Sequence, residues 1–127
     1  MKKLLEQSLA IRSALTPLVG MELDFKTSYK IAKLIKSLDD DAKFFEDQMR
    51  SILERFAEKD ESGNLVYADE NKTSVKVTDE KKEECAKCLQ ELQAVEVEIP
   101  DVKFSIEELQ GIKMTPFALS AITDIIE

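Results

Sequence analysis

Between residues 26 and 59, apolar side chains recur at alternating steps of four and three residues. This spacing is typical of an amphipathic helix with one apolar stripe. We call the stripe the heptad seam; it comprises Ile31, Ile35, Leu38, Ala42, Phe45, Met49, Ile52 and Phe56. At about 1.5 Å per residue, a helix over 26–59 would be roughly 45 to 50 Å long.

The seam must be covered, because a single domain of 127 residues rarely encloses so long a rod. We therefore expect self-association along the seam, with a homodimer as the first expectation. A second arrangement stays open, in which shorter helices at 2–18 and 79–92 of the same chain cover it.

Shorter helices are predicted on both sides of the long one. Ser105 and Glu108 have the spacing of a capping box, and Thr115 followed by Pro116 is a typical helix start. Either Asp24 or Thr27 can cap the long helix. The helices predicted in this way cover residues 2–16, 106–110 and 116–126, together with a helix over 79–93 that follows Thr78.

Two segments have the alternation of β-strands. Residues 64–77 hold two short apolar runs around a polar turn, which predicts a hairpin. Residues 95–99 alternate valine or isoleucine with glutamate and stop at Pro100, which predicts a half-buried strand. The predicted fold is a single domain over 1–127 of the mainly α (α+β) class: a long central helix, shorter packed helices and a small antiparallel sheet formed by the hairpin and the strand.

The net charge of the chain and its distribution bear on whether the protein binds nucleic acid. The net charge is −8, with about +4 on residues 1–38 and −12 on residues 39–127. This acidic balance argues against general nucleic-acid binding. One basic ridge follows helical spacing at Lys26, Lys30, Lys33 and Lys36. It is either a phosphate-contacting strip or a solvated helix face that pairs with the acidic remainder of the chain or of a partner. We favour the solvated face because we find no aromatic residue or arginine on the ridge.

The residue types that usually form catalytic or metal sites do not occur here in a known catalytic or metal-binding pattern. Cys85 and Cys88 supply two metal ligands where zinc takes about four, and the chain contains no histidine. We expect both cysteines to be reduced packing residues. No catalytic triad or phosphate-binding loop is present, so we expect no enzyme activity, no cofactor and no metal.

Two acidic segments have simple structural interpretations. Asp60 begins a pattern that resembles a calcium loop, but Leu65 and Asn71 stand where such a loop needs glycine and glutamate. We interpret this segment as a helix end leading into the hairpin. The run Asp39-Asp40-Asp41 cannot point one way from a helix, and we expect a solvated acidic turn.

Four segments carry a resemblance. They are Leu-Asp-Phe-Lys-Thr-Ser-Tyr-Lys-Ile-Ala-Lys-Leu at 23–34, the stretch 50–64, Leu-Gln-Ala-Val-Glu-Val-Glu-Ile at 92–99 and Met-Thr-Pro at 114–116. Together they resemble small bacteriophage and prophage proteins of unknown function. The resemblance implies a gene product that acts inside the bacterial host cell, in virion assembly or in host takeover, with a phage or host protein as partner.

The function expected from these features is that of a non-enzymatic protein-interaction protein. An alternative is a nucleic-acid accessory protein that uses the basic ridge. No apolar run reaches the roughly 20 residues that span a bilayer, and Glu6 and Arg12 interrupt any signal-peptide core. We therefore expect a cytoplasmic protein.

Overall fold

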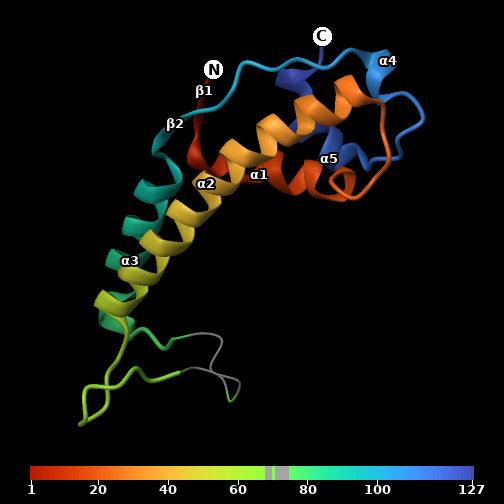
Figure 1. Ribbon diagram of the computed structural model, residues 1–127. Helices are drawn as coiled ribbons and strands as arrows, with labels where there is room; N and C mark the ends of the chain where they lie inside the picture. Colours follow the sequence, from red (N-terminus) through yellow and green to blue (C-terminus); the bar gives the residue numbers. More distant parts are fainter. Residues whose placement is uncertain (68–69, 71–74) are drawn as a thin grey trace. The chain divides into compact units, whose positions relative to one another are not determined.

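The computed structural model describes residues 1–67, 70 and 75–127, and it is mainly helical with a two-stranded antiparallel sheet (Figure 1). This confirms the predicted fold class. The chain divides into two compact units. The first comprises Met1–Lys43 and Val95–Glu127, and the second comprises Phe44–Ala94. The longest helix, α2, contributes residues to both units.

Helix α2 (Phe25–Phe56) begins one residue before the predicted start and ends three residues before the predicted end. The side chain of Asp24 caps it, because Oδ1 accepts a hydrogen bond of 2.9 Å from the backbone N–H of Thr27. This settles the choice between the two candidate caps. The bond also stabilises the ionised carboxylate, so the pKa of Asp24 is lowered.

The first unit contains the remaining short elements except α3. Its fully buried side chains include Leu15, Leu34, Phe104 and Ile122, which come from α1, α2 and the C-terminal segment. The short elements of the first unit are β1 (Lys2–Leu4), α1 (Leu5–Leu15), the 3-10 turn η1 (Thr16–Leu18), β2 (Glu96–Glu98), α4 (Ile106–Leu109), α5 (Pro116–Ala121) and the 3-10 turn η2 (Thr123–Ile125).

The sheet of the first unit differs from the prediction. Strand β2 pairs antiparallel with β1, with Lys3 opposite Val97. The predicted partner was the hairpin at 64–77, and residues 2–4 were predicted to be helical. The pairing joins segments about ninety residues apart in sequence, so the local periodicity of residues 2–4 does not reveal it.

The C-terminal caps agree with the sequence pattern. The N–H of Glu108 donates to Oγ of Ser105 at 3.2 Å, and the N–H of Ser105 donates back to Oε1 of Glu108 at 3.1 Å. Thr115 caps α5 through one bond, because its Oγ1 accepts from the N–H of Ala118 at 3.1 Å, and Pro116 is the first residue of the helix. Both helices end earlier than predicted, and Gly111 has a φ of 85° in the connection between them, a conformation that favours glycine.

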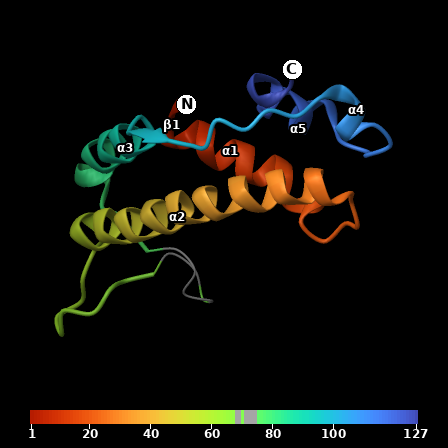
Figure 2. The same ribbon diagram turned by 45° about the horizontal axis from the view of Figure 1, so that its top comes forward.

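The second unit contains the last turns of α2 and helix α3 (Asp79–Gln93), which lies alongside them in both ribbon views (Figures 1 and 2). The bounds of α3 match the predicted helix. Cys85 and Leu92 are its buried residues, and Ile52 is buried on α2.

Three backbone segments meet beyond α2. The N–H of Glu58 donates to the carbonyl of Lys76, that of Lys76 donates to Val66, and that of Val66 donates to Glu58. One antiparallel bridge also joins Tyr67 with Val75. The bridge positions agree with the predicted hairpin, whose turn at 68–69 and 71–74 lies outside the described residues.

Candidate functional site

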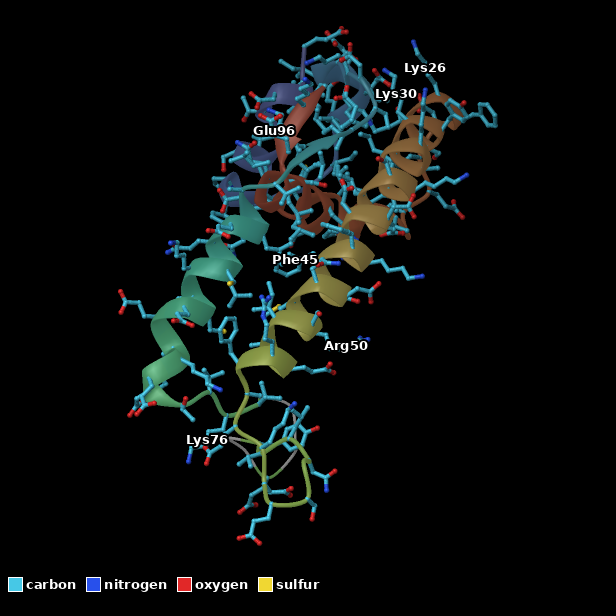
Figure 3. The ribbon with its side chains drawn as sticks, turned by 90° about the vertical axis from the view of Figure 1, so that its left-hand side faces the viewer. Lys26, Lys30, Phe45, Arg50, Lys76 and Glu96 are labelled. Carbon is cyan, nitrogen blue, oxygen red and sulfur yellow. The ribbon has the colours of Figure 1, made fainter. Side chains whose placement is uncertain are left out.

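The heptad seam faces inward in each unit. Ile31 and Leu38 belong to the core of the first unit, which they share with Ile11 and Leu15 of α1. In the second unit Phe45 points toward α3, whereas Arg50 points away from it (Figure 3). The other seam residues, Ala42, Ile52, Ile35, Met49 and Phe56, are buried or half-buried. Residues of the same chain therefore cover much of the seam, as the second arrangement expected.

One part of the seam remains open. Half-buried Ile35 lines a cavity of about 390 Å³ together with Val19 and Met21, which are 58 % and 45 % exposed. This is the apolar surface through which the seam could still meet another molecule.

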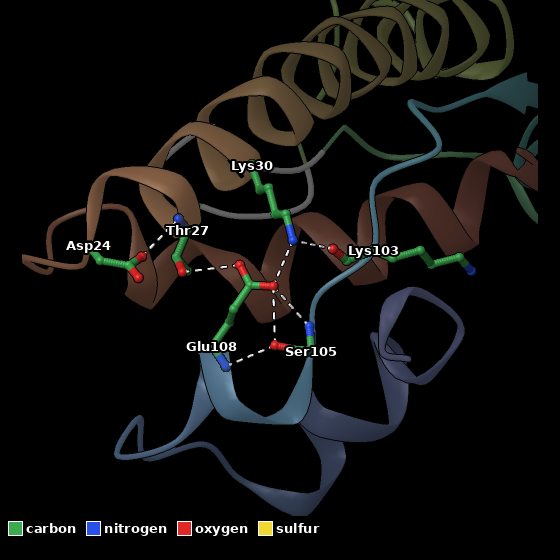
Figure 4. Close-up of polar contacts among 6 residues, drawn as sticks. All are labelled: Asp24, Thr27, Lys30, Lys103, Ser105 and Glu108. Carbon is green, nitrogen blue, oxygen red and sulfur yellow. Dashed lines mark hydrogen bonds and ion pairs between the residues drawn. The ribbon is translucent and has the colours of Figure 1, made fainter.

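Lys30, the second lysine of the basic ridge, is not free, because it is bonded to the C-terminal segment. The ammonium group of Lys30 donates to Oε1 of Glu108 at 2.6 Å and to the carbonyl of Lys103 at 2.7 Å (Figure 4). It also lies 5.6 Å from the ring centroid of Phe104. Lys30 therefore pairs with an acidic residue of the same chain and holds α2 against the C-terminal segment, whereas Lys26, Lys33 and Lys36 are exposed.

Glu108 accepts hydrogen bonds from several donors. Lys30 and the backbone N–H of Ser105 contact one carboxylate oxygen, and the hydroxyl of Thr27 donates to the other at 3.3 Å. The bond from Lys30 first, and that from Ser105 next, lower the pKa of Glu108 to about 2. A general base at neutral pH needs a pKa near the working pH, so this carboxylate is suited to structure and not to proton transfer.

Two exposed aromatic rings flank the remaining lysines of the ridge. Phe25 is 88 % exposed and Tyr29 is 62 % exposed, and their spacing of four residues places them on one face of α2. They line a cavity of about 430 Å³ with Lys26 and Lys33. We call these four residues the aromatic–lysine patch. Residues Asp101, Val102 and Lys103 line its other side.

The aromatic residues of this patch were missed in the sequence interpretation. Tyr29 stands three residues after Lys26 and four before Lys33, and Phe25 stands four residues before Tyr29; this helical spacing is the signal that could have revealed them. Their exposure could not be inferred, because aromatic residues near a helix start are commonly buried.

The second candidate surface is an apolar groove of about 560 Å³ in the C-terminal part of the first unit. Ile106 is 68 % exposed and Leu119 is 45 % exposed there. We call it the C-terminal groove; its apolar lining residues are Ile106, Leu109, Ile112, Met114, Leu119 and Ile126.

The acidic run on α2 is solvated at Asp39 and Asp40, as predicted, but two of its carboxylates also contact α1. Asp39 accepts a hydrogen bond of 2.7 Å from Nε of Arg12, and Asp41 accepts one of 2.7 Å from the hydroxyl of buried Ser8. The contact of Asp39 lies at the surface, whereas Asp41 is half-buried between α1 and α2 of the first unit.

The cysteines lie within the second unit. Cys85 is buried and Cys88 is half-buried, and both thiols are free. Burial raises the pKa of Cys85, which lowers its thiolate content and its reactivity. In the part of the chain that the structure describes, no group of three or more Cys, Asp or Glu residues is placed to hold a metal ion.

In the segment that resembles a calcium loop, the side chain of Asp60 is bonded to backbone N–H groups of the same segment. Oδ1 of Asp60 accepts hydrogen bonds of 2.9 Å from the N–H groups of both Ser62 and Asn64. Gly63, between them, has a φ of 82°. This is the geometry of a turn in which an aspartate side chain bonds the backbone two residues on, as the helix-end interpretation expects.

Comparison with known proteins found no match: no family model, no curated protein and no solved structure resembles this chain significantly. Among the helices formed by the described residues, none is both long and apolar enough to cross a membrane. The resemblance to phage proteins therefore stays a prediction.

Proposed function

We propose that this chain is a non-enzymatic interaction protein that binds a partner protein through the C-terminal groove. The observation that carries the proposal is the exposure of Ile106 and Leu119 beside a cavity of about 560 Å³ lined by aliphatic side chains. Contiguous exposed apolar surface is typical of interaction sites on small proteins.

The aliphatic lining of the groove suits an amphipathic partner segment. Such segments anchor aliphatic side chains spaced three or four residues apart in a hydrophobic groove. Exposed Glu107 and Glu127 adjoin the lining residues Ile106 and Ile126 in the chain, and exposed Lys113 adjoins Ile112 and Met114, so two carboxylates and one ammonium group flank these four residues. Opposite charge across an interface favours correct association, so we propose a partner segment with lysine or arginine beside its apolar face.

The biological setting is part of the same proposal. The resemblance of the segments at 23–34, 50–64, 92–99 and 114–116 supports a bacteriophage or prophage origin. We propose that the protein acts in virion assembly or host takeover in the cytoplasm of the bacterial host, where the partner is a phage or host protein.

Self-association is the second part of the proposal. Because Ile31 and Leu38 are already used in the core, a homodimer would form at the open part of the seam, where Val19 and Met21 are exposed beside Ile35. A two-fold dimer places the same patch of both copies together, which suits a small apolar surface of this kind.

The test of the groove is selection from a library of short peptides displayed on yeast. Selected peptides should share aliphatic residues at helical spacing with a basic flank, and Leu119→Glu should abolish their binding. Phe117→Glu is the matched control, because Phe117 is 86 % exposed and is not among the groove-lining residues. Peptides without this pattern, or equal binding to the Leu119→Glu protein, would contradict the proposal.

A further inference from the structure

We propose that the aromatic–lysine patch binds single-stranded nucleic acid, which is a function separate from protein binding at the C-terminal groove. The starting observation is a pair of rings, Phe25 and Tyr29, that are 88 % and 62 % exposed on one face of α2. Exposed aromatic rings beside lysines are the combination with which proteins bind single strands: bases stack on the rings and phosphates pair with the ammonium groups.

The spacing of the rings suits consecutive bases. Four residues of α-helix separate Phe25 from Tyr29, so their Cα atoms are about 6 Å apart along the helix axis. Stacked bases are about 3.4 Å apart along one strand. The two rings can therefore receive bases that are one or two steps apart on a partly extended strand, and stacking of this kind tolerates any base.

The lysines provide the phosphate contacts. Lys26 and Lys33 are exposed, line the same cavity as the rings and form no ion pair with a described residue. Figure 3 shows Lys26 directed outward, whereas Lys30 is already bound to Glu108. Two phosphate contacts are therefore available: Lys26 lies between the two rings in sequence, and Lys33 follows Tyr29 by four residues.

The surroundings of the patch carry charges of both signs. Lys103 lines the cavity, but its ammonium group donates to the backbone carbonyl of Asp124 and its charge acts on the carboxylate of Asp124. Asp101 contributes one negative charge at the same rim, and the exposed carboxylate of Asp24, next to Phe25 in the chain, lies close enough to Lys26 to feel its charge. The remaining acidic charge of the chain acts weakly over distance, because salt at 0.1 M screens charges beyond about 10 Å.

The geometry favours single strands over duplexes. In a duplex the faces of the bases are stacked on one another, so Phe25 and Tyr29 would find no base to stack on. The two lysines alone would give weak contact with a duplex backbone. Preference for single strands is thus the feature that separates this proposal from simple attraction between charges.

The experiment measures the fluorescence anisotropy of short labelled oligothymidine, oligouridine and a duplex, titrated with the full chain between about 50 and 200 mM salt. The single strands should bind more tightly than the duplex. With two phosphate contacts, the logarithm of the binding constant should fall with the logarithm of the salt concentration at a slope of about −1.4. Comparison of the two single strands shows whether the site prefers DNA or RNA.

Two sets of variants locate the site. Phe25→Ala and Tyr29→Ala should each weaken binding by about 5- to 150-fold, the loss expected from one stacked base. Combined Lys26→Glu and Lys33→Glu should abolish binding. The matched controls are Phe117→Ala, which removes an equally exposed ring, and combined Lys81→Glu and Lys87→Glu, which make the same change in net charge on α3.

The outcomes that would overturn the proposal are distinct. They are an absence of binding to either single strand, equal affinity for the duplex, or the same loss of binding in the control variants as in the patch variants. Circular dichroism of each variant shows whether it is folded. The peptide selection at the C-terminal groove does not depend on these results, so either function can fail without the other.

Discussion

The ammonium group of Lys30 lies 2.6 Å from a carboxylate oxygen of Glu108, seventy-eight residues further along the chain. Both side chains are largely shielded from solvent, with 22 % and 13 % of their surface exposed. The pair fastens the first turns of α2 to the capping box of α4. It also removes the most central lysine from the basic ridge and leaves Lys26 and Lys33 on the surface.

This pair predicts a specific pH dependence of stability. The folded protein lowers the pKa of Glu108 from about 4.5 to about 2, so between these values the unfolded chain takes up the proton more readily. The contribution of Glu108 to the free energy of unfolding is present above pH 4.5 and should be lost as the pH falls toward 2.

The substitution Glu108→Gln tests this predicted pH dependence of stability. The variant should have a lower Tm at pH 7, and the difference from the unaltered protein should shrink as the pH is lowered from about 4.5 to about 2. Thermal unfolding followed by circular dichroism over this range measures it. Glu107→Gln, an exposed neighbour, is the control. A difference in Tm that does not vary with pH would show that the pair has no such role.

A second prediction concerns the core of the first unit. Phe104 has 0 % exposure, so Phe104→Ala should lower the free energy of unfolding by about 3 to 5 kcal/mol. Urea denaturation measures this loss. Phe104→Leu should lose less, because it keeps an apolar side chain in the site, and it serves if the alanine variant does not fold.

Phe117 supplies the comparison, because its ring is 86 % exposed. Phe117→Ala should change the free energy of unfolding by no more than about 0.5 kcal/mol. Equal losses at Phe104 and Phe117 would mean that the first unit does not pack as described.

A third prediction concerns the oligomeric state. Light scattering after size exclusion should give a mass near twice 14.4 kDa for the chain, and a mass near 14.4 kDa for Met21→Glu, which places a charge in the open part of the seam. A mass near 14.4 kDa for the unaltered chain would exclude the homodimer. A dimer that persists in Met21→Glu would place the interface elsewhere.

A fourth prediction concerns the cysteines. Cys88 should be alkylated by iodoacetamide faster than Cys85, because Cys85 is buried and its pKa is raised. Mass spectrometry of peptides from the native protein gives the two rates, and denatured protein gives the reference in which both thiols react alike. Faster modification of Cys85 would contradict the described packing of α3.

Local signals in the sequence predicted the local parts of this fold. Helix α3 has the bounds expected from its start after Thr78, and the capping box of Ser105 and Glu108 forms as its spacing indicates. These features depend on residues a few positions apart. The same holds for the start of α5 at Pro116.

The parts that depend on distant contacts could not be predicted. Nothing within residues 2–4 indicates that they pair with Glu96–Glu98, because Lys-Lys-Leu is too short to show the period of a helix or of a strand. The same limit applies to the candidate sites. Lys30 and Lys33 look alike in sequence, and only the position of Glu108 in space makes one a structural residue and leaves the other exposed.

The first unit is built from two separate stretches of chain, with the whole second unit between them in sequence. A ribosome adds about 5 to 20 residues each second, so Leu34 and Leu38 leave it several seconds before Phe104 and Ile122 are made. During that interval these leucines lack part of the core that later covers them. The nascent chain therefore exposes apolar surface of α2 until residues 95–127 have been synthesised, and during that time it can associate with other chains.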